Sequence, residues 1–227
     1  MRARPLWREA AIDIFIETVA LTFGALLPIM NPFSTAPLFI SLTSGFDSRR
    51  RNRQALMACI YAFAILVTFL LLGAAIIDFF GISIPGIRVA GGLIISATGF
   101  RMLFPAPKNL GSAQAGAAQQ EADVAFTPIA MPSLAGPGSI SVVLTAAGHI
   151  RSIRPEDWQF VYVAVIAGMV VTLIFSCIVL RASAAMIRFM GPGGIDAMTR
   201  IFGFLLICIG IQFLLTGISD YFGLAHA

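Results

Sequence analysis

The stretch PIMNPFSTAPLFIS, residues 28–41, decides how this chain is expected to fold. It places Pro28, Pro32 and Pro37 inside what otherwise reads as a membrane-spanning helix. A proline in a helix interior removes a backbone hydrogen bond and clashes with the carbonyl four residues earlier, at a cost of roughly 3 kcal/mol or more. The first span is therefore predicted to be a broken helix.

The composition is that of an integral membrane protein. Of the 227 residues, 58% are hydrophobic and 11% are charged, and the mean hydropathy is +0.91. A soluble domain would carry about 25% charged residues. The net charge of +4 is accounted for by arginines in the expected loops and does not indicate a nucleic-acid partner.

Six apolar segments are candidate spans. Residues 55–77 and 160–180 carry no charge and have the roughly 20 residues that a spanning helix needs. The other four segments are residues 12–30, 81–100, 126–148 and 201–219. Six spans is the economical count, and a count of eight segments, with spans one and four each split in two, stays open. Residues 181–195, which end in GPGGI, are expected to be a surface loop or a short amphipathic segment.

The two halves of the sequence resemble each other. A shift of 100 residues aligns the three prolines of the first stretch with three of the second, Pro128, Pro132 and Pro137. A shift of 112 aligns Arg88 and Gly91 with Arg200 and Gly203. The segment 105–125, rich in Ala, Gly and Gln, reads as a flexible linker between repeats 1–104 and 126–227.

A unit of three spans ends on the opposite side of the membrane, so the second copy must insert upside down. The predicted fold is an all-α polytopic membrane bundle of six transmembrane helices, built as two inverted three-helix repeats, with helices 1 and 4 broken by prolines. Inverted repeats of this kind are typical of secondary transporters and of some channels.

The proline stretches predict a cavity shared by the two repeats. Each proline leaves one backbone carbonyl without its helical hydrogen-bond partner. Within the membrane such a carbonyl is tolerated only where it is buried in protein or lines a water-filled cavity. The six carbonyls concerned are those of Gly24, Pro28, Phe33, Val124, Pro128 and Ser133. The alternative is that the prolines only kink helices for packing, since proline is frequent in transmembrane helices.

The breaks also create helix starts. Asn31 and Pro32 fit the N-cap and first helical positions, and Gly136 and Pro137 repeat that arrangement, with Gly138 allowing a ligand close to the backbone. A helix N-terminus suits an anion such as a carboxylate, whereas freed carbonyls suit an ammonium group. The predicted ligand is a zwitterion such as a small amino acid. The candidate substrate-binding residues are Asn31, Pro32, Ser34, Thr35, Pro37, Pro132, Ser133, Gly136, Pro137, Gly138 and Ser139.

Two charged residues are candidates for gating or coupling. Arg88 lies at the start of span three, where a charge suggests function by default; the alternative is that its side chain snorkels to the interface. Glu17 could carry a coupling proton if buried, or lie at the outer interface. The coupling ion would be H⁺ or Na⁺. No cofactor or metal site is expected, because the three cysteines lie in apolar runs and read as core residues.

Basic loops are retained in the cytoplasm, and this sets the expected orientation. With six spans, one side gathers most of the 15 lysines and arginines, including the run of Arg49, Arg50, Arg51 and Arg53. Both termini are therefore predicted to face the periplasm, although the basic N-terminal tail argues against this.

Several of these stretches together are similar to the MarC family of bacterial inner-membrane proteins: NPFSTAPLF, RNRQALMA, FGISIPGIRVAGGLIISATGFRMLFP, AMPSLAGPGSI and GGIDAMTRIFGFLL. The resemblance runs nearly end to end and implies a multi-pass protein of the bacterial inner membrane. It also implies membership of the wider superfamily of amino-acid exporters that includes the lysine exporter group, in which some relatives carry glycine or alanine. The signature stretches are residues 31–37 and 132–138, and Met131 stands where the first copy has Asn31.

The predicted function is secondary transport: export of a small neutral amino acid or similar metabolite by alternating access, in a lipid bilayer, as a monomer or a homo-oligomer. The alternative is an aquaporin-like small-solute channel, although the second copy reads MPS where such a pore would repeat the NPF of the first. An enzyme is not expected, since Ser139 and His149 would lie about 15 Å apart along one helix.

Overall fold

The computed structural model describes residues 6–105, 125–153 and 158–224, and all of their regular structure is helical. In these ranges the helices are α1 (Leu6–Met30), α2 (Pro32–Leu42), α3 (Ser48–Phe80), α4 (Ile84–Leu103), the π-helix η2 (Ala125–Leu134), α5 (Pro137–Ile153) and α6 (Trp158–Phe222). The expected all-α class is confirmed.

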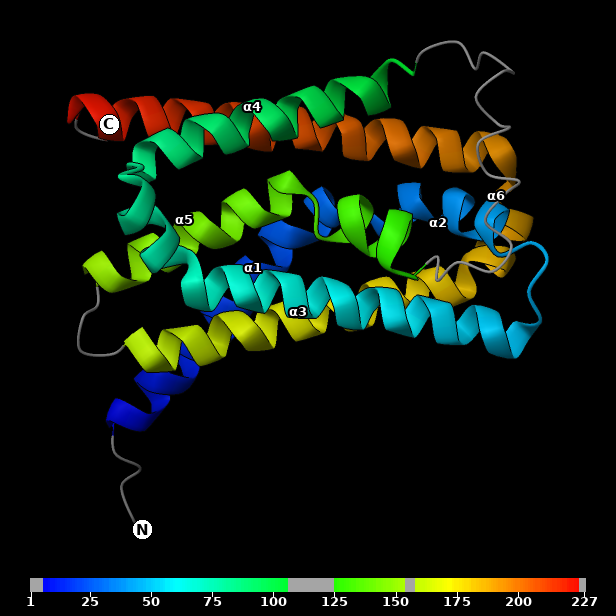
Figure 1. Cartoon of the computed structure of the whole chain (residues 1–227), viewed down its shortest axis with the longest axis horizontal. Helices are drawn as coiled ribbons and strands as arrows, with labels where there is room; N and C mark the ends of the chain where they lie inside the picture. The colour runs from blue at the N-terminus through cyan, green and yellow to red at the C-terminus, as the bar shows by residue number, and fades with distance from the viewer. Residues whose placement is uncertain (1–5, 106–124, 154–157, 225–227) are drawn as a thin grey trace.

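The helices lie roughly along one direction and the chain alternates between the two ends of the bundle (Figure 1). In the view of Figure 1, α1 and α2 lead from left to right, α3 returns, and α4 leads to the right again. The second half of the chain starts from the opposite end: η2 and α5 lead from right to left, and α6 goes out and comes back. Helix α1 therefore begins at the same end of the bundle at which α6 finishes.

Four helical segments within the described residues are long and apolar enough to cross a membrane: Ile12–Met30, Ser48–Phe80, Trp158–Gly191 and Gly193–Phe222. They coincide with four of the six expected spans. The expected span 81–100 corresponds to α4, which has 20 residues but carries two arginines and several glycines that dilute its apolar character. The expected span 126–148 corresponds to η2 and α5, which are separated by a break.

Helix α6 continues through the segment that was expected to be a loop. Residues 181–190 are helical, and the only non-helical backbone inside α6 is at Gly191, with φ 67° and ψ 175°. A positive φ favours glycine, and a following proline cannot continue the helical hydrogen bonding. The prediction of a loop over 181–195 was therefore wrong, and the chain turns at one residue.

The two halves of the chain pack almost entirely against each other. The most extensive contacts are those of α4 with α6, and α1, α2 and α3 also pack on α6 or α5. Among the described helices, α5 with α6 is the one substantial contact between helices of the same half. The repeats 1–104 and 126–227 are thus not separately packed bodies, and the division between them stays a prediction about the sequence.

Glycines bring the backbones of α4 and the second part of α6 into direct contact. A methyl group on Gly92 would lie 2.5 Å from the Gly210 carbonyl oxygen, and one on Gly99 would lie 2.6 Å from that of Gly203. Gly92 and Gly99 are seven residues apart in α4, and Gly203 and Gly210 are seven residues apart in α6. Seven residues are about two helical turns, so the two contacts lie on one face of each helix. Small residues permit such close approach in membrane helix pairs.

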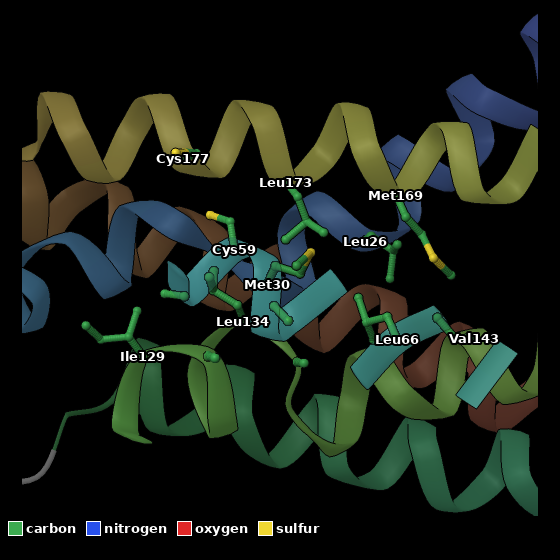
Figure 2. Close-up of a cluster of buried hydrophobic side chains, with 14 of the residues drawn as sticks. Leu26, Met30, Cys59, Leu66, Ile129, Leu134, Val143, Met169, Leu173 and Cys177 are labelled. Carbon is green, nitrogen blue, oxygen red and sulfur yellow. The ribbon is translucent and has the colours of Figure 1, made fainter. Parts of the chain in front are cut away.

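The apolar core lies between α1, α2, α3, η2, α5 and α6 (Figure 2). Leu26 and Met30 of α1 are 1% exposed, and Ile129 and Leu134 of η2 are fully buried. Both proline stretches are therefore fixed in the core directly beside the points where their helices break.

Candidate functional site

The first break lies at Asn31, between α1 and α2. Its backbone is left-handed, with φ 35° and ψ 70°, a conformation that non-glycine residues rarely adopt and that asparagine tolerates best. Its side-chain Oδ1 accepts a hydrogen bond from the Ser34 amide at 3.1 Å, and Pro32 occupies the first turn of α2. Asn31 is 4% exposed, and its Nδ2 donates to Met102 Sδ at 3.7 Å, so α4 also contacts this break.

The second break lies at residues 135–136, between η2 and α5. In η2 the helix widens to π geometry, in which the Ala135 amide donates to the Ala130 carbonyl at 2.8 Å. Helix α5 starts at Pro137, and the Ser139 hydroxyl donates back to the Leu134 carbonyl at 3.1 Å.

The two helix starts differ in the donors they leave open. At α2, Asn31 caps the Ser34 amide, and the Thr35 amide and hydroxyl both donate to the Asn31 carbonyl at 3.3 and 3.2 Å. At α5, Gly136 has no side chain to act as a cap, and its carbonyl accepts from the Ile140 amide at 3.0 Å. The first amides of a helix have no partner within it, and at α5 these are the amides of Gly138 and Ser139.

Both breaks face one cavity of about 270 Å³. Eight of the candidate substrate-binding residues line it: Asn31, Ser34, Thr35, Ser133, Gly136, Pro137, Gly138 and Ser139. Pro32 and Pro37 belong to α2 but do not line it, and the side chain of Pro132 lies outside the described part of the chain. Six carbonyls were expected to be freed by the prolines. Among the described residues that carry them, only Ser133 lines this cavity.

Helix α4 supplies a wall of the cavity that sequence reasoning missed. Ile94, Ile95, Thr98 and Met102 of α4 line it, spaced as one helical face. Ile94 is 38% exposed and Leu38 of α2 is 40% exposed, so the cavity opens between α2 and α4. No sequence signal marks these residues beyond their helical spacing, because apolar residues on such a face are equally typical of packing.

A charge cluster lies at the end of the bundle where α1 begins. Arg88 of α4 forms an ion pair with Asp220 of α6, and its other terminal nitrogen lies 3.2 and 3.1 Å from Nδ1 and Nε2 of His149 in α5. The Arg88 side chain is 14% exposed. Seven residues separate Arg88 from Ile95 in α4, so the cluster is about 10 Å from the cavity. Arg88 thus joins three helices beside the cavity instead of extending alone to the surface.

Glu17, the other candidate for coupling, does not join this cluster by any described bond. It is exposed on α1 and lines a second cavity of about 280 Å³, together with Thr18 and His149. His149 therefore contacts Arg88 and also borders the cavity that contains Glu17.

Comparison with known proteins covers nearly the whole chain. A family model described as MarC family integral membrane protein matches residues 16–222. Proteins named UPF0056 inner membrane protein MarC from Escherichia coli strain K12, E. coli O139:H28 and Shigella flexneri are each 41% identical over 225 residues, covering 95% of this chain and 100% of the relative. No solved structure gives a significant match. The chain belongs to the MarC family of integral membrane proteins.

Proposed function

We propose that this protein is a secondary transporter that exports a small neutral amino acid or similar metabolite by alternating access. The observation that carries the proposal is that two helix breaks far apart in sequence, at Asn31 and at residues 135–136, border one cavity. Irregular backbone at membrane depth is typical of transporter binding sites, which lie where two repeats meet.

The course of the chain supports six crossings arranged as inverted repeats. The first broken pair, α1 and α2, leads in one direction, and the second broken pair, η2 and α5, leads in the opposite direction (Figure 1). Each pair is followed by two further passes. The bacterial relatives are named inner membrane proteins, and we place this chain in that membrane with both termini in the periplasm.

The chemistry of the cavity suits a small zwitterion. The amides of Gly138 and Ser139, which have no partner within α5, would donate to a carboxylate, helped by the positive end of the α5 dipole. The hydroxyl oxygens of Ser34, Thr35 and Ser133 would accept from an ammonium group. A volume of about 270 Å³ lies below the roughly 300–1,000 Å³ of drug-sized ligand sites, so the cavity favours a short side chain.

The charge cluster would close the cavity on the side of the termini. An ion pair between α4 and α6, backed by His149, ties three cavity-lining helices together. Opening toward that side would require Arg88 and Asp220 to separate, and we propose Arg88 and Glu17 as the residues that couple transport to H⁺ or Na⁺.

Liposomes containing the purified protein test this function. We expect counterflow to accelerate uptake of radiolabelled alanine or glycine, and a variant with both Asn31→Ala and Gly138→Leu to abolish it. A β-carbon on Gly138 would lie 3.1 Å from both Ile29 and Ile95, so leucine would fill this side of the cavity. Gly24→Leu, on α1 with open space around it, is the matched control and should transport normally.

The alternative function is an aquaporin-like channel for small solutes, and the same liposomes separate the two. A rise in water or glycerol flux without amino-acid exchange would establish the channel. Neither function involves catalysis, a cofactor or a nucleic-acid partner.

A further inference from the structure

A groove between α3 and the first part of α6 is unrelated to the cavity at the helix breaks. It has a volume of about 360 Å³ and its walls are apolar except at one end, where Arg181 lies. From α3 it is lined by Leu56, Cys59, Ile60 and Phe63, and from α6 by Val170, Leu173, Ile174, Cys177 and Ile178. The groove is open: Ile174 is 55% and Ile178 is 58% exposed.

The groove has the length of one membrane leaflet. Val170 and Arg181 bound it on α6 and are eleven residues apart, which is about 16 Å along a helix. The hydrocarbon core of a bilayer is about 30 Å thick, so the groove extends from the interface to near the midplane. Arg181 marks the interface, because it is the first charged residue after the uncharged run 158–180.

The charged end of the groove is positive and not neutralised. Leu56 and Cys59 of α3 line the groove together with Cys177 and Arg181 of α6, and α3 and the first part of α6 run in opposite directions (Figure 1). The N-terminus of α3, with the exposed Arg53, therefore lies at the same end as Arg181. The ion pairs among the described residues are Arg88 with Asp220 and Arg200 with Asp196, and neither involves Arg53 or Arg181.

We propose that this groove binds one anionic phospholipid, with its phosphate on Arg181 and one acyl chain along α3 and α6. A bare apolar groove would accept any lipid tail, but an unpaired arginine at its interfacial end selects an anionic headgroup. The proposal depends on the membrane location of the chain and not on what it transports.

Native mass spectrometry of the detergent-purified protein tests the headgroup contact. Wild type should bind phosphatidylglycerol more tightly than phosphatidylcholine. Arg181→Gln should weaken phosphatidylglycerol binding roughly fivefold, as expected for one surface arginine worth about 1 kcal/mol, and leave phosphatidylcholine binding unchanged. Arg181→Lys should keep most of the preference. Arg200→Gln, at another exposed arginine of α6, is the control and should keep all of it.

Photo-crosslinking tests the position of the tail. Phosphatidylglycerol with a diazirine in its acyl chain should label peptides 56–63 and 170–178, and Ile178→Trp, which fills the groove, should abolish that labelling. Soluble glycerol phosphate should not compete. The proposal is overturned if Arg181→Gln keeps the preference for phosphatidylglycerol, or if Ile178→Trp separates an oligomer while no lipid crosslinks, since the groove would then be an interface between copies of the chain.

Discussion

Arg88 in α4 forms an ion pair with Asp220 in α6, 132 residues away in the chain, at the end of the bundle where α1 begins. Both side chains are largely buried, with 14% and 22% exposed. A counter-charge at this depth matters more than at the surface, because water screens the arginine less.

Removing the carboxylate should destabilise the protein. Asp220→Asn leaves Arg88 with only a neutral partner, and we expect a loss of about 2 kcal/mol in the free energy of unfolding. Thermal unfolding in detergent measures it, and a double-mutant cycle with Arg88→Gln should show that the two changes are not additive. Asp196→Asn breaks an exposed pair of 2.9 Å and should cost less than about 0.5 kcal/mol. Equal effects of the two changes would contradict a structural role for the buried pair.

The glycine contacts of α4 should not tolerate a methyl group. Gly92→Ala would place a β-carbon 2.5 Å from the Gly210 carbonyl oxygen, and we expect a loss of about 1–3 kcal/mol from overpacking. Gly24→Ala adds the same methyl where nothing lies within 4 Å. That control should be neutral or slightly stabilising, because alanine favours a helix more than glycine does. A stable Gly92→Ala variant would mean that α4 and α6 pack less closely than described.

Substitutions of Asn31 should separate its two structural roles. Asn31→Ala removes the cap of α2 and also places alanine in a left-handed conformation, so we expect a loss of about 2 kcal/mol or more. Asn31→Gly removes the cap, but glycine readily adopts the left-handed backbone, so this change should lower the free energy of unfolding by only a few tenths of a kcal/mol. Unfolding in detergent measures both. If Asn31→Gly proves as destabilising as Asn31→Ala, tolerance of the left-handed backbone is not the reason why asparagine stabilises this position.

Thr98 should be reachable from water. It is exposed on α4 and lines the cavity, so Thr98→Cys should react with a membrane-impermeant thiol reagent in a background where the exposed Cys208 is replaced by serine. Thr68→Cys, an equally exposed threonine on α3 outside the cavity, is the control and should stay unlabelled in liposomes. Labelling of both positions at the same rate would show that exposure on the bundle, and not the cavity, admits the reagent.

The helix breaks were predictable from the sequence because they depend on neighbouring residues. Asn31 before Pro32, and Gly136 before Pro137, specify a helix end and a new start within two positions. The alignment by 100 residues was less informative, since it pairs Pro32 with Pro132, which lies inside η2. A proline breaks a helix completely only where a cap or a glycine precedes it.

The wall from α4 and the ion pair of Arg88 could not be predicted in the same way. Both depend on which helices become neighbours, and that depends on packing between residues more than 60 positions apart. The extension of α6 past Arg181 was missed because its charges suggested a surface loop. A helix can leave the membrane without ending, and within α6 the turn comes at Gly191, which has a positive φ.

The packing of one half of the chain on the other has a consequence for biogenesis. A ribosome delivers α1 to α4 first, yet these helices find nearly all of their contacts on helices that are translated later. Until the second part of α6 emerges, Gly92 and Gly99 lack the residues on which they pack, and until Asp220 emerges Arg88 lacks the counter-ion of its ion pair. Asp220 lies within three residues of the end of α6, so its ion pair with Arg88 can form only after nearly all of α6 has been translated. A nascent chain stalled before that point should remain a substrate for membrane proteases.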